Sequence, residues 1–100
     1  MITSLERFVK LDQTSVGEIE SERNFIRDTL EVLRATGEIS NDAFLDAGTI
    51  QGGLTLLQNL LSQGISEEEA SEQLRSLKAR AEVLNKTYLD LDRKVENMRK

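Results

Sequence analysis

Apolar residues in the last third of the chain recur at alternating steps of four and three residues. The row consists of Ala70, Leu74, Leu77, Ala81, Leu84, Tyr88, Leu91, Val95 and Met98. This spacing places every member on one face of an α-helix, as in a coiled coil or a long bundle helix. Ser66 and Glu69 fit a capping box at its start, and Glu96 with Lys100 is an i,i+4 pair in the favourable order. The pattern predicts one helix over residues 66–98.

The first third of the chain repeats this spacing with two polar interruptions. The row is Leu5, Val9, Asp12, Val16, Ile19, Arg23, Ile26, Leu30 and Leu33. Thr3 and Glu6 fit a capping box at the start. Ser15 and Glu18 offer a competing start for a second helix, but the apolar spacing stays in register across them. We therefore predict one helix over residues 3–36.

The two polar residues in this row, Asp12 and Arg23, are candidates for an interaction role. A polar side chain on the apolar face of a bundle helix specifies register or partner at a cost in stability. Each residue therefore lies in water near a bundle end or pairs across an interface, and the sequence leaves both alternatives open.

The middle segment is apolar and lacks charge. Its row is Ala47, Ile50, Leu54, Leu57 and Leu61, widened by Leu56 and Leu60. Residues 47–66 include no charged side chain. Ser40 fits an N-cap, and Gly64 fits the end of a helix. The segment predicts a helix over residues 41–63, although glycines in its interior cost roughly 1 kcal/mol each relative to alanine.

Together these segments predict an all-α fold in a single domain of residues 1–100. We expect an antiparallel three-helix bundle or a coiled-coil hairpin, with long first and third helices and a shorter, Gly-containing middle helix. The absence of proline from all 100 residues suits long uninterrupted helices. A chain of this length buries about 60–65% of its unfolded surface, so a partner could contribute to its stability.

The composition argues against catalysis. The chain has no cysteine and no histidine, so it lacks a thiolate nucleophile, the usual general base near neutral pH and the commonest transition-metal ligands. Carboxylate pairs occur at Asp42/Asp46 and Asp90/Asp92, but general acid–base chemistry needs a concave apolar site that raises one pKa. We expect no enzyme activity, no cofactor and no metal.

The charge distribution argues against nucleic acid as a partner. Thirteen basic residues are outnumbered by eighteen acidic ones, and the basic side chains of the last helix alternate with acids rather than forming a phosphate-binding patch. The N-terminus lacks a secretory signal pattern, and no stretch approaches a membrane span. We expect a soluble cytoplasmic protein, with leaderless export left open.

The middle helix contains the candidate binding surface. Gly48 and Gly52 share one helix face, which permits close approach of another helix. Gly53 adds a third bare position, and Leu56 and Leu60 lie to one side of the main apolar row. These residues either pack on the chain's own first or third helix or meet a partner. We expect a non-enzymatic protein–protein interaction module that self-associates, in a role such as adaptor, assembly or secretion chaperone, or small inhibitor such as a phage counter-defence protein.

The C-terminal residues Tyr88-Leu89-Asp90-Leu91-Asp92 suggest a first alternative. With the chain length and the helical hairpin character, this Tyr-x-x-x-Asp segment resembles the small helical substrates and partner proteins of type VII secretion. The resemblance implies export directed by Tyr88 and Asp92. The chain has no tryptophan and so lacks the family's Trp-x-Gly turn.

A second alternative is an oligomeric bundle that binds a small ligand. The ligand would be a signalling nucleotide held at a subunit interface. This function requires basic residues that converge between subunits.

Overall fold

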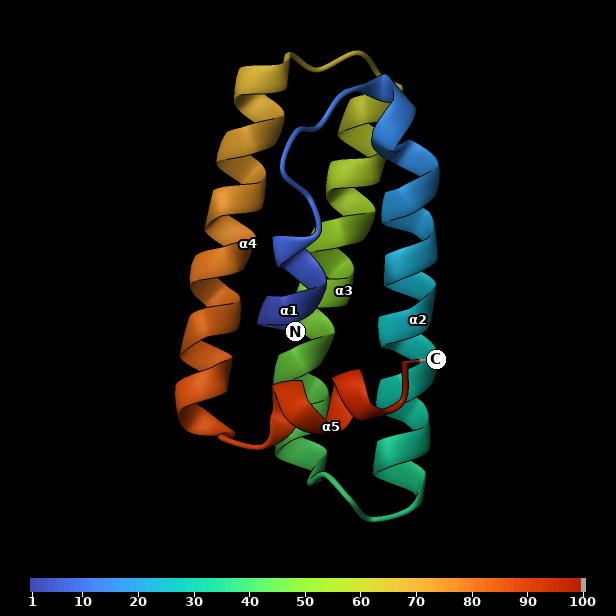
Figure 1. The fold of residues 1–100 in the computed structure, drawn as a ribbon, viewed down its shortest axis with the longest axis vertical. Helices are drawn as coiled ribbons and strands as arrows, with labels where there is room; N and C mark the ends of the chain where they lie inside the picture. Colours follow the sequence, from blue (N-terminus) through green and yellow to red (C-terminus); the bar gives the residue numbers. More distant parts are fainter. Residues whose placement is uncertain (100) are drawn as a thin grey trace.

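Three long helices form the frame of the molecule, and two short helices from the ends of the chain cross it (Figure 1). The structure is a computed structural model that describes residues 1–99. Its helices are α1 (Ile2–Glu6), α2 (Val16–Ala35), α3 (Asn41–Ser62), α4 (Glu67–Thr87) and α5 (Leu91–Asn97), with a 3₁₀ turn at Gln13–Ser15. The expected all-α class is confirmed, with five α-helices in the described residues where we expected three.

Local signals set the ends of the long helices. The Ser40 hydroxyl accepts a hydrogen bond from the Ala43 amide at 3.1 Å, and the Ser66 hydroxyl accepts one from the Glu69 amide at 3.2 Å. Each bond satisfies an amide that has no partner within its helix. The turn after α2 contains Gly37 with φ 77°, a left-handed conformation that glycine adopts without strain.

The central helix is α3, which packs along α2 on one side and along α4 on the other. The long helices run antiparallel, and α2 and α4 are not packed along each other (Figure 1). This arrangement leaves an open apolar face between α2 and α4. The short helices α1 and α5, here called the terminal pair, lie over that face and close it (Figure 1).

One continuous core joins the frame to the terminal pair. The terminal segments bury Met1, Leu5, Phe8, Leu11, Leu91 and Val95 against the apolar rows of the long helices. Burial of each large apolar side chain contributes about 1.5–3 kcal/mol. The terminal pair therefore completes the core.

The prediction of one helix over residues 3–36 is wrong. The chain leaves α1 after Glu6 and re-enters a helix only at Val16, close to the competing start at Ser15. Asp12 stabilises this break, since its carboxylate accepts a hydrogen bond from the Thr14 amide at 2.8 Å. The non-helical connection allows Phe8 and Leu11 to enter the core, where a straight helix would have carried them away from it.

The prediction of one helix over residues 66–98 is also wrong. α4 ends at Thr87, and Tyr88 has φ −123° and ψ 83°, which takes the chain out of the helix. After the bend, Leu91 and Val95 lie in the core with 3% and 0% of their surface exposed. Continued helix would project them into water beyond the frame. The Glu96–Lys100 pair lies outside the described residues.

Candidate interaction surface

The outward side of α3 presents a row of uncharged side chains that the fold leaves uncovered. The row is Leu45, Thr49, Gly52 and Leu56, here called the α3 face. Leu45 is 67% exposed and Leu56 is 51% exposed. Leu60 is half-buried at the margin of this row. Two large apolar side chains therefore remain in water on one side of a single helix.

A groove of about 320 Å³ runs beside this row, between α3 and α4. Gly52, Gly53 and Leu56 line it from α3, and Ser76 and Arg80 line it from α4. The groove has one cationic side chain and no acidic one in its lining. Its volume and composition suit an apolar side chain flanked by hydrogen-bonding groups.

The three glycines of α3 have different surroundings. A Cβ atom added at Gly53 would lie 2.1 Å from Leu77 Cδ2, so the Leu77 side chain of α4 packs directly on the bare backbone and would have to shift to admit a side chain there. A Cβ at Gly48 or Gly52 would meet no atom within 4 Å. Within the chain, the close approach of α3 to α4 is therefore made at Gly53, and a partner at Gly48 and Gly52 stays a prediction.

Contacts along α3 and α4 fix how the two helices are aligned. Leu77 packs on Gly53, and Arg80 Nη1 donates a hydrogen bond to the Thr49 carbonyl oxygen at 3.4 Å. The Tyr88 hydroxyl donates a hydrogen bond to Asp46 Oδ2 at 2.6 Å. Residues near Asp46 therefore lie at the same level as the last turns of α4. Leu45 accordingly lies at the same end of the groove as Val83, which is 63% exposed, whereas Leu56 lies at the other end.

The Tyr88–Asp46 bond also affects the ionisation of the phenol. The hydrogen bond to Asp46, with partial burial and the carboxylate charge, raises the pKa of Tyr88 from 10.0 to about 12. The neutral phenol is the bonded form. Tyr88 therefore holds the end of α4 against α3.

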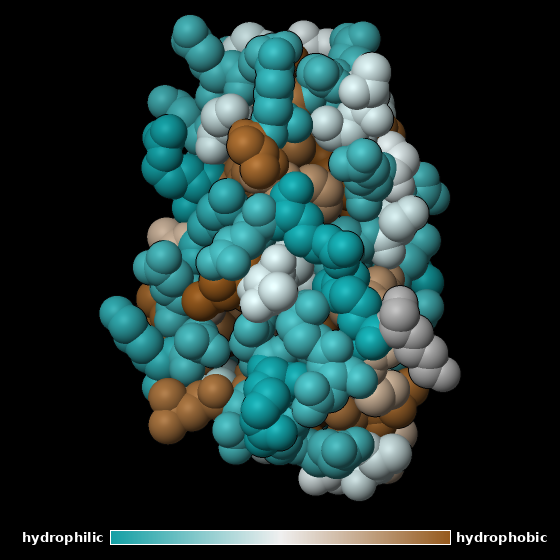
Figure 2. Space-filling view, viewed as in Figure 1, coloured by the Kyte–Doolittle hydropathy of each residue, from teal (hydrophilic) through white to brown (hydrophobic). Residues whose placement is uncertain are grey.

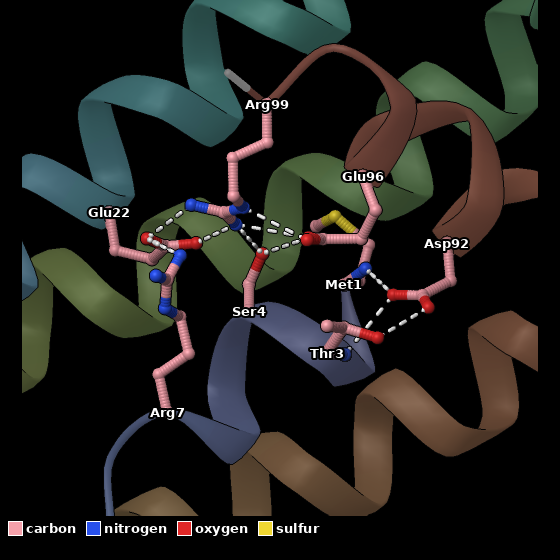
Figure 3. Close-up of polar contacts among 8 residues, drawn as sticks. All are labelled: Met1, Thr3, Ser4, Arg7, Glu22, Asp92, Glu96 and Arg99. Carbon is pink, nitrogen blue, oxygen red and sulfur yellow. Dashed lines mark hydrogen bonds and ion pairs between the residues drawn. The ribbon is translucent and has the colours of Figure 1, made fainter.

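The opposite face of the molecule is locked by a polar network around Arg99 (Figure 3). The Arg99 guanidinium donates to both carboxylate oxygens of Glu22, at 3.1 Å and 2.5 Å, and to Glu96 Oε1 at 2.9 Å. It also donates to the Ser4 hydroxyl at 3.1 Å and lies 4.1 Å from the centre of the Phe25 ring. The network thus joins α1 and α2 to the last turn of α5 and to Arg99, which follows it.

These contacts stabilise the charged forms of both partners. Hydrogen bonds to Glu96 and Glu22 raise the pKa of Arg99, and the bond from Arg99 lowers the pKa of Glu96. Glu22 is 7% exposed, and a buried carboxylate requires such partners. The members of this network bond to one another across α1, α2 and α5, so the network has a structural role.

A second set of contacts at Asp92 secures α1 (Figure 3). Its carboxylate accepts hydrogen bonds from the Thr3 hydroxyl at 2.7 Å, from the Thr3 amide at 3.1 Å and from the amino group of Met1. Partial burial opposes ionisation, but these donors outweigh it and lower the pKa of Asp92. The predicted capping role of Thr3 is therefore wrong, because its hydroxyl bonds to a residue of α5.

The other residues singled out in the sequence also have internal roles. Asp12 caps the 3₁₀ turn, and Arg23 Nη1 donates to Gln58 Oε1 of α3 at 2.9 Å. Tyr88 and Asp92 of the type VII-like segment bond to Asp46 and Thr3. These contacts occupy the polar atoms without any partner protein.

Sequence patterns alone missed the buried Glu22 and the exposed Leu45. Glu22 lies three residues after Ile19 and four before Ile26, so its position on a core-facing row was a usable signal. Leu45 stands outside the apolar row of α3, and the same helical spacing could have placed it outward beside Leu56.

The described residues offer little for metal or anion binding. Among residues 1–99, no group of three acidic side chains is arranged to hold a metal ion. A surface hollow at the start of α4 is lined by Glu67, Glu68, Ser71, Glu72 and Arg75, which places Arg75 among acids. No helix in this part of the chain combines the length and apolar composition that a membrane span needs.

Residues 1–99 thus form a small bundle of five α-helices in which two leucines on the outward side of α3 remain exposed. Comparison of the chain with protein-family models, curated proteins and solved structures found no match.

Proposed function

We propose that this chain is a non-enzymatic protein–protein interaction module that binds through the α3 face and the groove beside it. The observation that carries the proposal is the exposure of Leu45 and Leu56 on one side of α3, a helix that has no charged residue after Asp46. Single exposed apolar residues are normal on protein surfaces. Here two leucines flank a groove on the same helix, which is the arrangement expected of a contact surface.

The difference in cover between the two faces of the frame supports this proposal. The terminal pair and the Arg99 network cover the face between α2 and α4, where Figure 2 shows a surface that is mostly hydrophilic. The α3 face has no comparable cover. An adaptor, an assembly or secretion chaperone and a small inhibitor would each use such a surface, and all fall within this class.

Substitution of Leu56 tests the proposal. Leu56→Glu places a charge on the α3 face, and Leu89→Glu places the same charge at a residue that is 80% exposed in the turn after α4. Both variants should fold, since neither residue is in the core. We expect Leu56→Glu to lose self-association, measured by sedimentation velocity, and to lose any partner recovered by affinity capture, whereas Leu89→Glu retains both. If Leu56→Glu is folded and retains them, the proposed function is wrong.

A further inference from the structure

We propose that the occupant of the α3 face is a second copy of this chain, whose α3 packs antiparallel on the first across a two-fold axis between Thr49 and Gly52. This inference rests on the proposed function and names its partner. Three features of the described residues carry it: the order of residues on the α3 face, the position of Val83, and the location of acidic residues on α3.

The spacing of the residues on the α3 face is the same in both directions along the helix. The steps from Leu45 to Thr49, to Gly52 and to Leu56 are four, three and four residues. A two-fold contact is self-complementary: where residue i of one chain meets residue j of its partner, residue j of the first chain meets residue i of the partner. An antiparallel pair centred between Thr49 and Gly52 therefore brings Leu45 against the partner's Leu56. A single two-fold axis therefore covers the leucines at both ends of the row.

The alignment of α3 with α4 strengthens this pairing. Leu45 and Val83 lie at the same end of the groove, whereas Leu56 lies at the other end. In the antiparallel pair, the partner's Leu56 reaches the end where Leu45 and Val83 are exposed. The partner's Leu56 is then buried together with Leu45 and Val83, once at each end of the interface.

The bare backbone at the centre permits the close approach that this arrangement needs. A side chain at Gly52 would point into open space within one chain, so folding alone does not explain a glycine at this position. Packed helices lie about 8–10 Å apart, at a distance set by the side chains at their contact. With Gly52 opposite the partner's Thr49, the separation of the two helix axes should lie near the lower end of this range.

Charge favours the antiparallel direction over the parallel one. The acidic residues of α3, Asp42 and Asp46, lie in its first turns, and its remaining residues are uncharged. A parallel pair would place like charges beside each other, which is destabilising. In the antiparallel pair the acidic end of each α3 lies beside the uncharged end of the other, and the opposed helix dipoles are also favourable.

Cysteine cross-linking tests this geometry directly. The chain contains no cysteine, so Leu45→Cys and Leu56→Cys chains can be made separately, mixed and oxidised. We expect disulfide-linked dimers in the mixture at least tenfold above those in either sample alone. In the antiparallel pair two copies of residue 45 lie roughly 16 Å apart along the helices, beyond the Cα separation of about 7 Å that a disulfide spans.

The other outcomes overturn the inference. Cross-links within each separate sample would show a parallel pair, and no cross-link above a Leu89→Cys control would show that a second copy does not cover the α3 face. In the second case the Leu56→Glu capture experiment still decides the proposed function. The two failures are therefore distinguishable.

A substitution at Gly52 separates association from folding. Gly52→Gln adds a good helix former at a position where an added Cβ meets no atom within 4 Å, so its melting temperature should equal or exceed that of the parent when both are measured as monomers at low protein concentration. At the axis the same side chain would hold the two helices apart. We expect the concentration at half-dimerisation in sedimentation equilibrium to rise at least tenfold. Unchanged dimerisation of the folded variant would overturn the proposed axis.

Discussion

At the scale of the residue, neighbouring glycines of α3 have opposite roles. Gly53 is packed against Leu77, whereas a Cβ added at Gly52 would meet no atom within 4 Å. The identity of the residue is the same in both places, and only the surroundings differ. Alanine substitutions at the two positions should therefore give variants of different stability.

We expect Gly52→Ala to increase the free energy of unfolding by about 1 kcal/mol, since alanine is the better helix former. Gly53→Ala should be less stable than Gly52→Ala by about 1–3 kcal/mol, because its Cβ overpacks the buried contact with Leu77. Urea denaturation of both variants at low protein concentration measures this difference. Equal stabilities would show that α4 accommodates a methyl group at Gly53 without cost.

Tyr88 allows a second measurement at a single residue, because it is the chain's only tyrosine and there is no tryptophan. Its ultraviolet absorbance titration should give a pKa of about 12, raised by the hydrogen bond to Asp46. In Asp46→Asn the pKa should move back towards 10.0. A pKa near 10.0 in the parent protein would mean that the bond is not formed in solution.

The sign of the effect on stability follows from this shift. Because the pKa of Tyr88 is higher in the folded chain than in the unfolded chain, the stabilisation is complete below pH 10.0 and is lost as the pH rises towards about 12. Tyr88→Phe cannot ionise. Its stability should therefore fall less over this interval than that of the parent.

At the scale of the element, the Arg99 network decides whether the terminal pair stays on the frame. Arg99 bridges Glu22 of α2, Glu96 of α5 and Ser4 of α1. Removing Arg99 leaves the carboxylate of Glu22 buried with only a distant contact from Arg7 at 3.8 Å. The cost of such a change comes largely from the group left behind.

We expect Arg99→Met to lower the free energy of unfolding by about 1–3 kcal/mol. The double variant Glu22→Met/Arg99→Met should recover part of this loss, because it removes the unpaired carboxylate as well. A double-mutant cycle by urea denaturation measures the coupling. Additive effects of the two substitutions would show that the ion pair contributes no coupling.

The helix boundaries show how far elements can be predicted from sequence. Ser40 and Ser66 act on backbone amides within a few residues, so their local patterns identified the starts of α3 and α4. The bend at Tyr88 has no glycine or proline to mark it. The four-three spacing continues through the bend, because an apolar residue at position 91 suits both a straight helix and a chain that folds back into the core. The spacing therefore does not reveal the bend.

The candidate site was predictable only in part, because it depends on contacts between helices that local patterns do not report. Helical spacing could place Leu56 away from the main apolar row of α3, but it could not say which glycine contacts a neighbouring helix. That distinction depends on the alignment of α3 with α4, which joins Gly53 to Leu77 across the turn between them. The Arg99–Glu22 pair joins residues still further apart in sequence. Such contacts leave no periodic signal.

At the scale of the whole molecule, the terminal pair and the frame share one core. The same cluster of buried side chains contains residues of α1, α5 and all three long helices. Because α2 and α4 are not packed along each other, lifting the terminal pair would expose the apolar face between them. The frame therefore should not persist as a stable unit without its cover.

Leu91→Ala tests this cooperativity, because Leu91 is 3% exposed in the core, whereas Leu89, at 80% exposed, lies two residues away. We expect Leu91→Ala to lower the global free energy of unfolding by about 2–5 kcal/mol and Leu89→Ala to change it by no more than about 0.5 kcal/mol. Hydrogen exchange should show the loss in α3 as well as in α5. If Leu91→Ala instead accelerates exchange only in α1 and α5, the terminal pair opens by itself, and the face between α2 and α4 becomes a second surface that a partner helix can reach.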